Sequence, residues 1–151
     1  MMATNDAAGS GAGRREEYSA GELQYLLQAY QEQYSVLTRE MKEASDMVMG
    51  ISSAMEVLDN KDIVAKKESL MPAGAGLYMY ANTGESKSVV VGIGGGLMIE
   101  MDAADAKEVL NKRFEAQREN MNRISRQMKQ VEDTIYDISY KLEGLAADLN
   151  V

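Results

Sequence analysis

The sequence predicts an α+β protein, mainly α, in which two small β-hairpins join the helices of a long antiparallel coiled-coil hairpin. Two observations predict this fold. An apolar residue recurs at alternating steps of four and three in two stretches of almost equal length, one at each end of the chain. Such a seven-residue repeat gives 3.5 residues per turn and keeps one stripe of a helix facing a partner. Between these stretches lie strand and turn residues rich in glycine.

The first helix is predicted over residues 18–60. Ser19 and Glu22 have the spacing of a capping box, in which each side chain accepts a hydrogen bond from the backbone amide of the other residue. The polar residues 59–62 interrupt the repeat and favour a helix end. The seam between these signals comprises Leu23, Leu27, Tyr30, Tyr34, Leu37, Met41, Ala44, Val48, Ile51, Met55 and Leu58.

Residues 66–101 are predicted to form two β-hairpins. Tyrosine, valine and isoleucine favour strands, whereas glycine and polar residues favour the turns between them. So small a sheet has exposed edges and apolar faces, which need a partner. The four expected strands contain residues 69–71, 77–80, 88–91 and 97–101.

The second helix is predicted over residues 102–150. Asp102 is a favourable N-cap, and Asp105 places a second acid near the positive end of the helix dipole. Gln117 is the polar exception in the seam of this helix. The seam comprises Leu110, Phe114, Gln117, Met121, Ile124, Met128, Val131, Ile135, Ile138, Leu142, Leu145 and Leu149.

We expect the two helices to pair within one chain, because their matched lengths give every seam residue of the first helix a partner in the second. This interpretation places Leu23 opposite Leu149 and Leu58 opposite Phe114. A register shifted by one heptad is the main alternative.

Several apolar residues lie off the seam, where a solvated coiled coil is polar. Tyr25, Leu26, Tyr136 and Tyr140 are expected near the far tip of the hairpin, where no other element of the chain can cover them. Single apolar residues on a surface are common and need no function. A cluster of them at one end is also typical of a partner-binding surface.

Composition excludes several functional classes. The 151-residue chain has a net charge of −8, which argues against binding to nucleic acids and to anionic membranes. It has no cysteine and no histidine, so disulfides, the commonest metal ligands and the commonest general base are absent. The glycine clusters are not followed by a helix start or by the lysine of a phosphate loop. We therefore expect neither an enzyme nor a cofactor.

The chain shows no targeting signal that we recognise. Residues 1–17 are small, polar and charged, and are expected to be a disordered tail. No apolar run is long enough for secretion or for a membrane span. A cytoplasmic location is therefore the expectation.

Two glycine-turned motifs lie in the middle of the chain. Residues 70–78 read Leu-Met-Pro-Ala-Gly-Ala-Gly-Leu-Tyr, and residues 89–100 read Val-Val-Val-Gly-Ile-Gly-Gly-Gly-Leu-Met-Ile-Glu. They resemble the first and second hairpins of the α-type subunit of prefoldin, a hexameric co-chaperone. Ala73 stands where that family often has glycine or a small residue, and Leu77 stands where serine is common. The resemblance implies a single prefoldin-like domain over residues 18–151.

The resemblance also implies how the chain assembles and what it does. Two α-type and four β-type subunits would join their hairpins into a β-barrel platform from which the coiled coils project. Their tips would capture unfolded client proteins without ATP and transfer them to a group II chaperonin. Client binding is expected at Tyr25, Leu26, Leu27, Tyr140, Leu145 and Leu149. Subunit assembly is expected at Leu70, Leu77, Tyr78, Val89, Val90, Val91, Ile93, Leu97 and Ile99.

Two alternatives stay open at the level of the sequence. One is a scaffold protein whose coiled coil binds a single defined partner. The other is a related subunit that forms filaments in place of hexamers.

Overall fold

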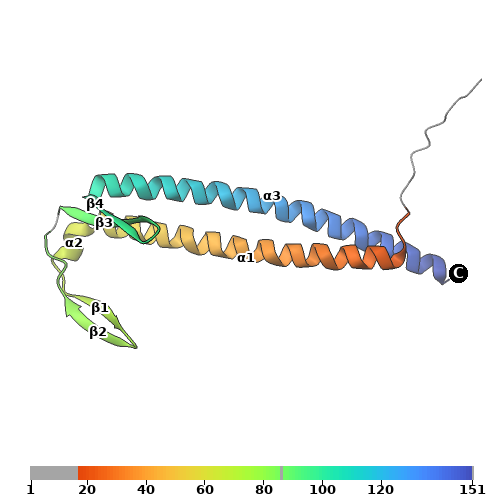
Figure 1. Cartoon of the computed structure of the whole chain (residues 1–151), viewed down its shortest axis with the longest axis horizontal. Coiled ribbons are helices and arrows are strands. Elements are labelled where there is room, and N and C mark those ends of the chain that lie inside the picture. The colour runs from red at the N-terminus through yellow and green to blue at the C-terminus, as the bar shows by residue number, and fades with distance from the viewer. Residues whose placement is uncertain (1–16, 86, 151) are drawn as a thin grey trace, which may run out of the picture.

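The computed structural model describes residues 17–85 and 87–150, so all but the last residue of the expected disordered tail lies outside the described residues. The predicted fold class is confirmed: two long helices run antiparallel, and two separate β-hairpins connect them (Figure 1). The elements are α1 (Ala20–Asp59), α2 (Lys61–Ala65), β1 (Ser69–Gly74), β2 (Leu77–Ala81), β3 (Ser88–Gly94), β4 (Leu97–Asp102) and α3 (Ala103–Leu149).

Both long helices begin at the caps that the sequence predicts. The capping box of Ser19 and Glu22 is present at the start of α1, and the Asp102 side chain accepts a hydrogen bond from the Asp105 amide at the start of α3. At the end of α1, the backbone and side-chain amides of Asn60 both donate to the carbonyl of Glu56. The short helix α2, which follows at once, has no apolar repeat and was not predicted.

The core is the narrow seam between α1 and α3. Among the described residues, the buried apolar side chains are Leu23, Leu37, Ala44, Ile51, Ala106, Ile124, Val131 and Ile138. Most of them recur at seven-residue intervals, as a coiled coil requires. So few buried residues give a chain of this length little hydrophobic stabilisation, which is a physical reason for it to assemble with other subunits.

The register of the two helices differs from the predicted one by four to six residues. Asp59 forms an ion pair with Lys107, whereas the predicted register places Arg113 opposite Asp59. At the other end, Leu23 lines one groove with Leu145 and is only 3% exposed. Its predicted partner Leu149 is 83% exposed. The predicted pairing is therefore wrong, by less than the full heptad of the alternative, and α3 extends beyond the start of α1 (Figure 1).

The hairpins lie at the end of the molecule where α1 ends and α3 begins, opposite the end where α1 begins and α3 ends (Figure 1). Strands β1 and β2 pair antiparallel, as do β3 and β4, but the two pairs do not join into one sheet. The β3–β4 hairpin packs against α3, whereas the β1–β2 hairpin projects away from the helices. The edges of both sheets therefore lack partners within the part of the chain that the structure describes.

The two hairpins repeat one local design. Each has a β-bulge just before its turn, at Pro72/Gly74 in the first and at Gly92/Gly94 in the second. The turn residue that follows has a left-handed backbone in both, and it is Ala75 (φ 50°) in the first and Gly95 (φ 59°) in the second. Because a side chain is disfavoured in this conformation, Ala75 is a strained position that its counterpart avoids.

Candidate functional site

The tip of the coiled-coil arm begins with a rigid cap. The Ser19 amide donates to the Glu22 carboxylate over 2.7 Å, and the Ser19 hydroxyl donates to the same oxygen over 2.9 Å. These hydrogen bonds favour the ionised form, so they lower the pKa of Glu22 below its usual value. The Glu22 amide in turn donates to the Ser19 hydroxyl over 3.3 Å. The first turn of α1 is therefore fixed although it is exposed.

Apolar side chains at the tip are incompletely covered. Of the residues predicted to bind clients, Tyr25, Tyr140 and Leu149 are highly exposed, Leu145 is exposed, and Leu26 and Leu27 are half-buried. Leu149 is uncovered because α3 continues past the start of α1 at this point. The six residues thus occupy one end of the arm.

A groove lies between the two helices at this tip and has a volume of about 860 Å³. Leu23 and Leu145 form its apolar floor, and charged side chains stand around them. Its lining comprises Glu17, Tyr18, Ser19, Glu22, Leu23, Lys141, Gly144, Leu145 and Asp148. A groove of this kind can bind an apolar side chain of a partner, because binding removes the apolar surface of the groove and of that side chain from water.

The hairpins present a second apolar surface. Leu70, Leu77, Tyr78, Val90, Ile93, Leu97 and Ile99, all predicted to serve assembly, are exposed in the isolated chain. Val89 and Val91 are half-buried, and because they alternate with the exposed Val90, they lie on the opposite face of β3. Met79, Tyr80 and Met98 are equally exposed. The sequence analysis did not select them, although their places in the predicted strands could have indicated them.

One arginine connects the second hairpin to the arm. The Arg113 guanidinium of α3 donates to the carbonyl of Gly92 in β3 over 2.5 Å, in a half-buried position. A hydrogen bond from a charged donor is stronger than one between neutral groups. Periodicity could not reveal this contact, because Arg113 lies off the seam and Gly92 has no side chain. It fixes the β3–β4 hairpin relative to α3.

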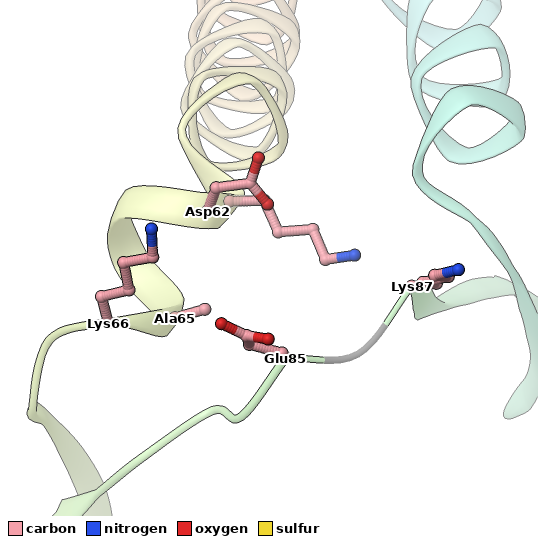
Figure 2. A pocket seen from close by; sticks show the side chains of 6 residues that line it. Asp62, Ala65, Lys66, Glu85 and Lys87 are labelled. Atoms are coloured by element: carbon pink, nitrogen blue, oxygen red, sulfur yellow. The ribbon is translucent and has the colours of Figure 1, made fainter.

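A hollow of about 370 Å³ lies where the first hairpin leaves the helices. Figure 2 shows Asp62 and Ala65 on α2 and Lys66 just after it, with Glu85 pointing toward them and Lys87 beyond. Lysine and acidic side chains are mixed around the hollow, so its lining does not favour a ligand of one sign of charge. Within the described part of the chain, no group of acidic side chains is arranged to hold a metal ion.

Comparison with known proteins identifies the family. The family model described as "Prefoldin subunit" matches residues 28–148, which is most of the chain. This chain belongs to the prefoldin family. The prefoldin subunit alpha of Methanothrix thermoacetophila is 32% identical over 117 residues, which cover 77% of this chain and 76% of that protein. The prefoldin subunit alpha of Thermofilum pendens is 29% identical, covering 69% of this chain and 92% of that one.

A solved structure shares the fold of this prefoldin subunit. The cryo-EM structure of filamentous prefoldin from Methanocaldococcus jannaschii matches it with a TM-score of 0.50 and 18% identity, covering 80% of this chain and 95% of that chain. Membership of a chaperone family agrees with the prediction that the chain is not an enzyme. None of the described helices has the length and apolarity needed to span a bilayer.

Proposed function

We propose that this prefoldin subunit holds non-native proteins at the tip of its arm, without ATP, and passes them to a group II chaperonin. The observation that carries this proposal is the exposure of Tyr25, Tyr140 and Leu149 at the free end of the arm. A two-helix coil that acted only as a spacer would have polar side chains at these positions. Location in the cytoplasm, where unfolded chains and chaperonins meet, belongs to the same proposal.

The energetics favour weak contacts used in numbers. Complete burial of one such apolar side chain contributes roughly 1.5 to 3 kcal/mol. Ordering a flexible client costs part of this gain, so one tip would bind weakly. Several arms attached to one platform raise the effective concentration of the remaining tips once the first is engaged. Each contact can then break quickly while the client stays held by the others, without a nucleotide cycle.

Assembly would use the other end of the chain. The unpaired edges of the two small sheets, with their exposed apolar faces, would be completed by hairpins of other subunits. The proposed complex has two α-type and four β-type subunits, and its hairpins close into a β-barrel platform. This separates the assembly surface from the client surface by the length of the coiled coil.

A blunt-ended arm tests the tip. In the observed register, a chain of residues 28–137 removes the exposed end from both helices and retains the core around Leu37, Ala44, Ile124 and Val131. It should assemble normally but fail to suppress aggregation of an unfolded client. A point variant, Tyr25→Ser/Tyr140→Ser/Leu149→Ser, should show the same loss. Val36→Ser/Met47→Ser, at exposed positions farther along α1, is the matched control and should retain activity. Full activity of the blunt-ended chain would refute the proposal.

Native mass measurement with and without a β-type subunit tests the assembly. A complex of two α-type and four β-type subunits is the expected product. A homo-oligomer or a filament that excludes the β-type subunit would contradict it. A protein that retained a single partner and ignored chemically unrelated unfolded clients would instead be a scaffold.

A further inference from the structure

The outer face of α3 near the tip alternates acidic and tyrosine side chains. Asp133, Tyr136, Asp137, Tyr140 and Glu143 are three or four residues apart, so they share one side of the helix over about 15 Å. All five are exposed, and the two tyrosines are 71% and 70% exposed. We call these five residues the acid–tyrosine face. It lies off the seam, so pairing with α1 does not account for it.

The charge of the arm changes along its length. Residues 17–35 and 130–150, the outer part of the arm that includes the tip, contain eight acidic residues and one lysine. Residues 36–59 and 106–129, nearer the hairpins, contain eight acidic and nine basic residues. An even distribution of the net negative charge would serve solubility equally well. The concentration of negative charge in the outer part of the arm therefore needs a further explanation.

The carboxylates of this face form no ion pair within the described residues. Asp133, Asp137 and Glu143 make no ion pair with any residue that the structure describes. Elsewhere on the same helices, Asp46 pairs with Lys42 and Glu108 pairs with Lys112 at helical spacing. Lys129 and Lys141 have the same spacing from Asp133 and Asp137 but do not pair with them. The three carboxylates thus remain accessible to a partner.

We propose that the acid–tyrosine face selects client segments that carry lysine and arginine among apolar residues. This inference rests on the proposed holding function and names the class of client that this subunit prefers. A lysine or arginine can lie over a tyrosine ring while its cation approaches the neighbouring carboxylate, so that both attractions act together. The stem of the same side chain covers the apolar ring.

Charge distinguishes this occupant from others. The tip of a second copy has the same acidic charge and would be repelled. Nucleic acids and anionic membranes are repelled for the same reason. A basic unfolded segment is attracted from a distance, which speeds its first encounter with the tip, and apolar contacts then retain it.

Three labelled peptides of about 20 residues test the proposal in fluorescence anisotropy, where affinity at low and high salt separates charge from apolar contact. They share the same apolar residues and differ in their spacers, which are lysine, glutamine or glutamate. The assembled full-length protein should bind the lysine peptide about tenfold more tightly than the glutamate peptide at about 50 mM salt, and the difference should shrink at higher salt.

Variants identify the residues responsible. Asp133→Asn/Asp137→Asn/Glu143→Gln should remove the preference and leave binding of the glutamine peptide unchanged. Glu108→Gln/Glu115→Gln/Glu119→Gln makes the same change in charge nearer the hairpins and should keep the preference. Tyr136→Leu/Tyr140→Leu should weaken binding of the lysine peptide more than that of the glutamine peptide, since leucine keeps an apolar surface but offers no ring to a cation.

Each contrary outcome is distinct. Equal binding of all three peptides, with aggregation still suppressed, overturns the charge selection and leaves the proposed function standing. Binding of none, with no suppression of aggregation, overturns both. A preference that emerges only after removal of residues 1–16, which contain Arg14 and Arg15, would assign the face to the chain's own N-terminal segment and overturn the proposal.

Discussion

The ammonium nitrogen of Lys107 lies 2.5 Å from a carboxylate oxygen of Asp59, which connects the first turns of α3 to the last turn of α1. Both side chains are about half exposed, so the pair contributes only a few tenths of a kcal/mol up to about 1 kcal/mol. Its main value is as a marker, because it reports which residues of the two helices face each other.

Cross-linking should reproduce this register. The chain has no cysteine, so Asp59→Cys can be combined with either Lys107→Cys or Arg113→Cys without a background thiol. Positions 107 and 113 are about 9 Å apart along the helix, at 1.5 Å per residue. A short bismaleimide should therefore join the thiol introduced at position 59 to the one at position 107 in high yield and to the one at position 113 poorly, as judged by mobility on a denaturing gel. The reverse yields would support the register expected from the heptads alone.

The sequence predicted the fold but not this register, for a physical reason. A heptad repeat presents a similar seam after a shift of about half a heptad or of one heptad, because its a and d positions are both apolar, so it specifies that two helices pair and specifies their alignment weakly. Contacts outside the repeat distinguish the alternatives. Asp59 pairs with Lys107, and Arg113, which the other register would place opposite Asp59, binds Gly92 instead. Neither contact has a periodic signature.

In the candidate sites, too, helical periodicity predicted some features, whereas others depend on tertiary contacts. Exposure of Tyr25 and Tyr140 could be predicted, because their positions off the seam depend only on helical periodicity. The exposure of Leu149 could not, since a seam residue is uncovered only when its partner helix ends early, and that depends on the register. Half-burial of Val89 and Val91 likewise depends on how the second hairpin packs against α3, which is a tertiary contact.

Removing the Arg113 contact should loosen the second hairpin selectively. Arg113→Met keeps much of the side chain's length and loses the hydrogen bond to the Gly92 carbonyl. We expect a loss of about 1 kcal/mol, toward the lower end for a charged hydrogen bond because the site is only half-buried, and thus roughly fivefold faster amide exchange in β3 and β4.

Amide exchange in β1 and β2, which do not pack on α3, provides an internal control for this variant. Arg118→Met, an exposed arginine one to two turns along the same helix, is the matched substitution and should leave the exchange of β3 and β4 unchanged. Equal acceleration in both hairpins would show that Arg113 acts on the whole molecule and not through Gly92.

The two turns should respond in opposite directions to the exchange of alanine and glycine. Ala75→Gly removes a side chain from a left-handed position and should stabilise the β1–β2 hairpin by about 1 kcal/mol. Gly95→Ala should destabilise the β3–β4 hairpin by a similar amount. A Cβ at Gly95 would contact nothing within 4 Å, so only the backbone conformation is tested. Amide exchange of each strand pair measures the effect, and changes of the same sign in both would contradict it.

Acid should loosen the tip of α1. Hydrogen bonds from Ser19 lower the pKa of Glu22 in the folded state, so the stabilisation is present above the ordinary glutamate pKa of about 4.3 and is lost as the pH falls through the lowered folded pKa. NMR titration of the Glu22 carboxyl carbon should show the lowered value, and the protection of the Leu23 amide against exchange, taken relative to its intrinsic rate at each pH, should fall over the same pH range. In Ser19→Ala the pKa of Glu22 should return toward its ordinary value. The return should be partial, because the backbone amide of residue 19, the larger cause of the lowered pKa, still donates in this variant. An ordinary pKa for Glu22 in the unaltered protein would exclude the cap.

The polar seam residue Gln117 should cost stability and favour one register. It is half-buried among the apolar seam positions of α3, where an amide side chain gains less from burial than a leucine would. Gln117→Leu should raise the free energy of unfolding by about 1 kcal/mol, read from denaturant midpoints at constant slope.

Because polar seam residues can specify alignment, Gln117→Leu should also let part of the population adopt the register predicted from the sequence. Cross-linking of the thiol pairs at positions 59 and 107 and at positions 59 and 113 would measure that population directly. A stabilised variant that still cross-links only through position 107 would show that the end contacts alone determine the register.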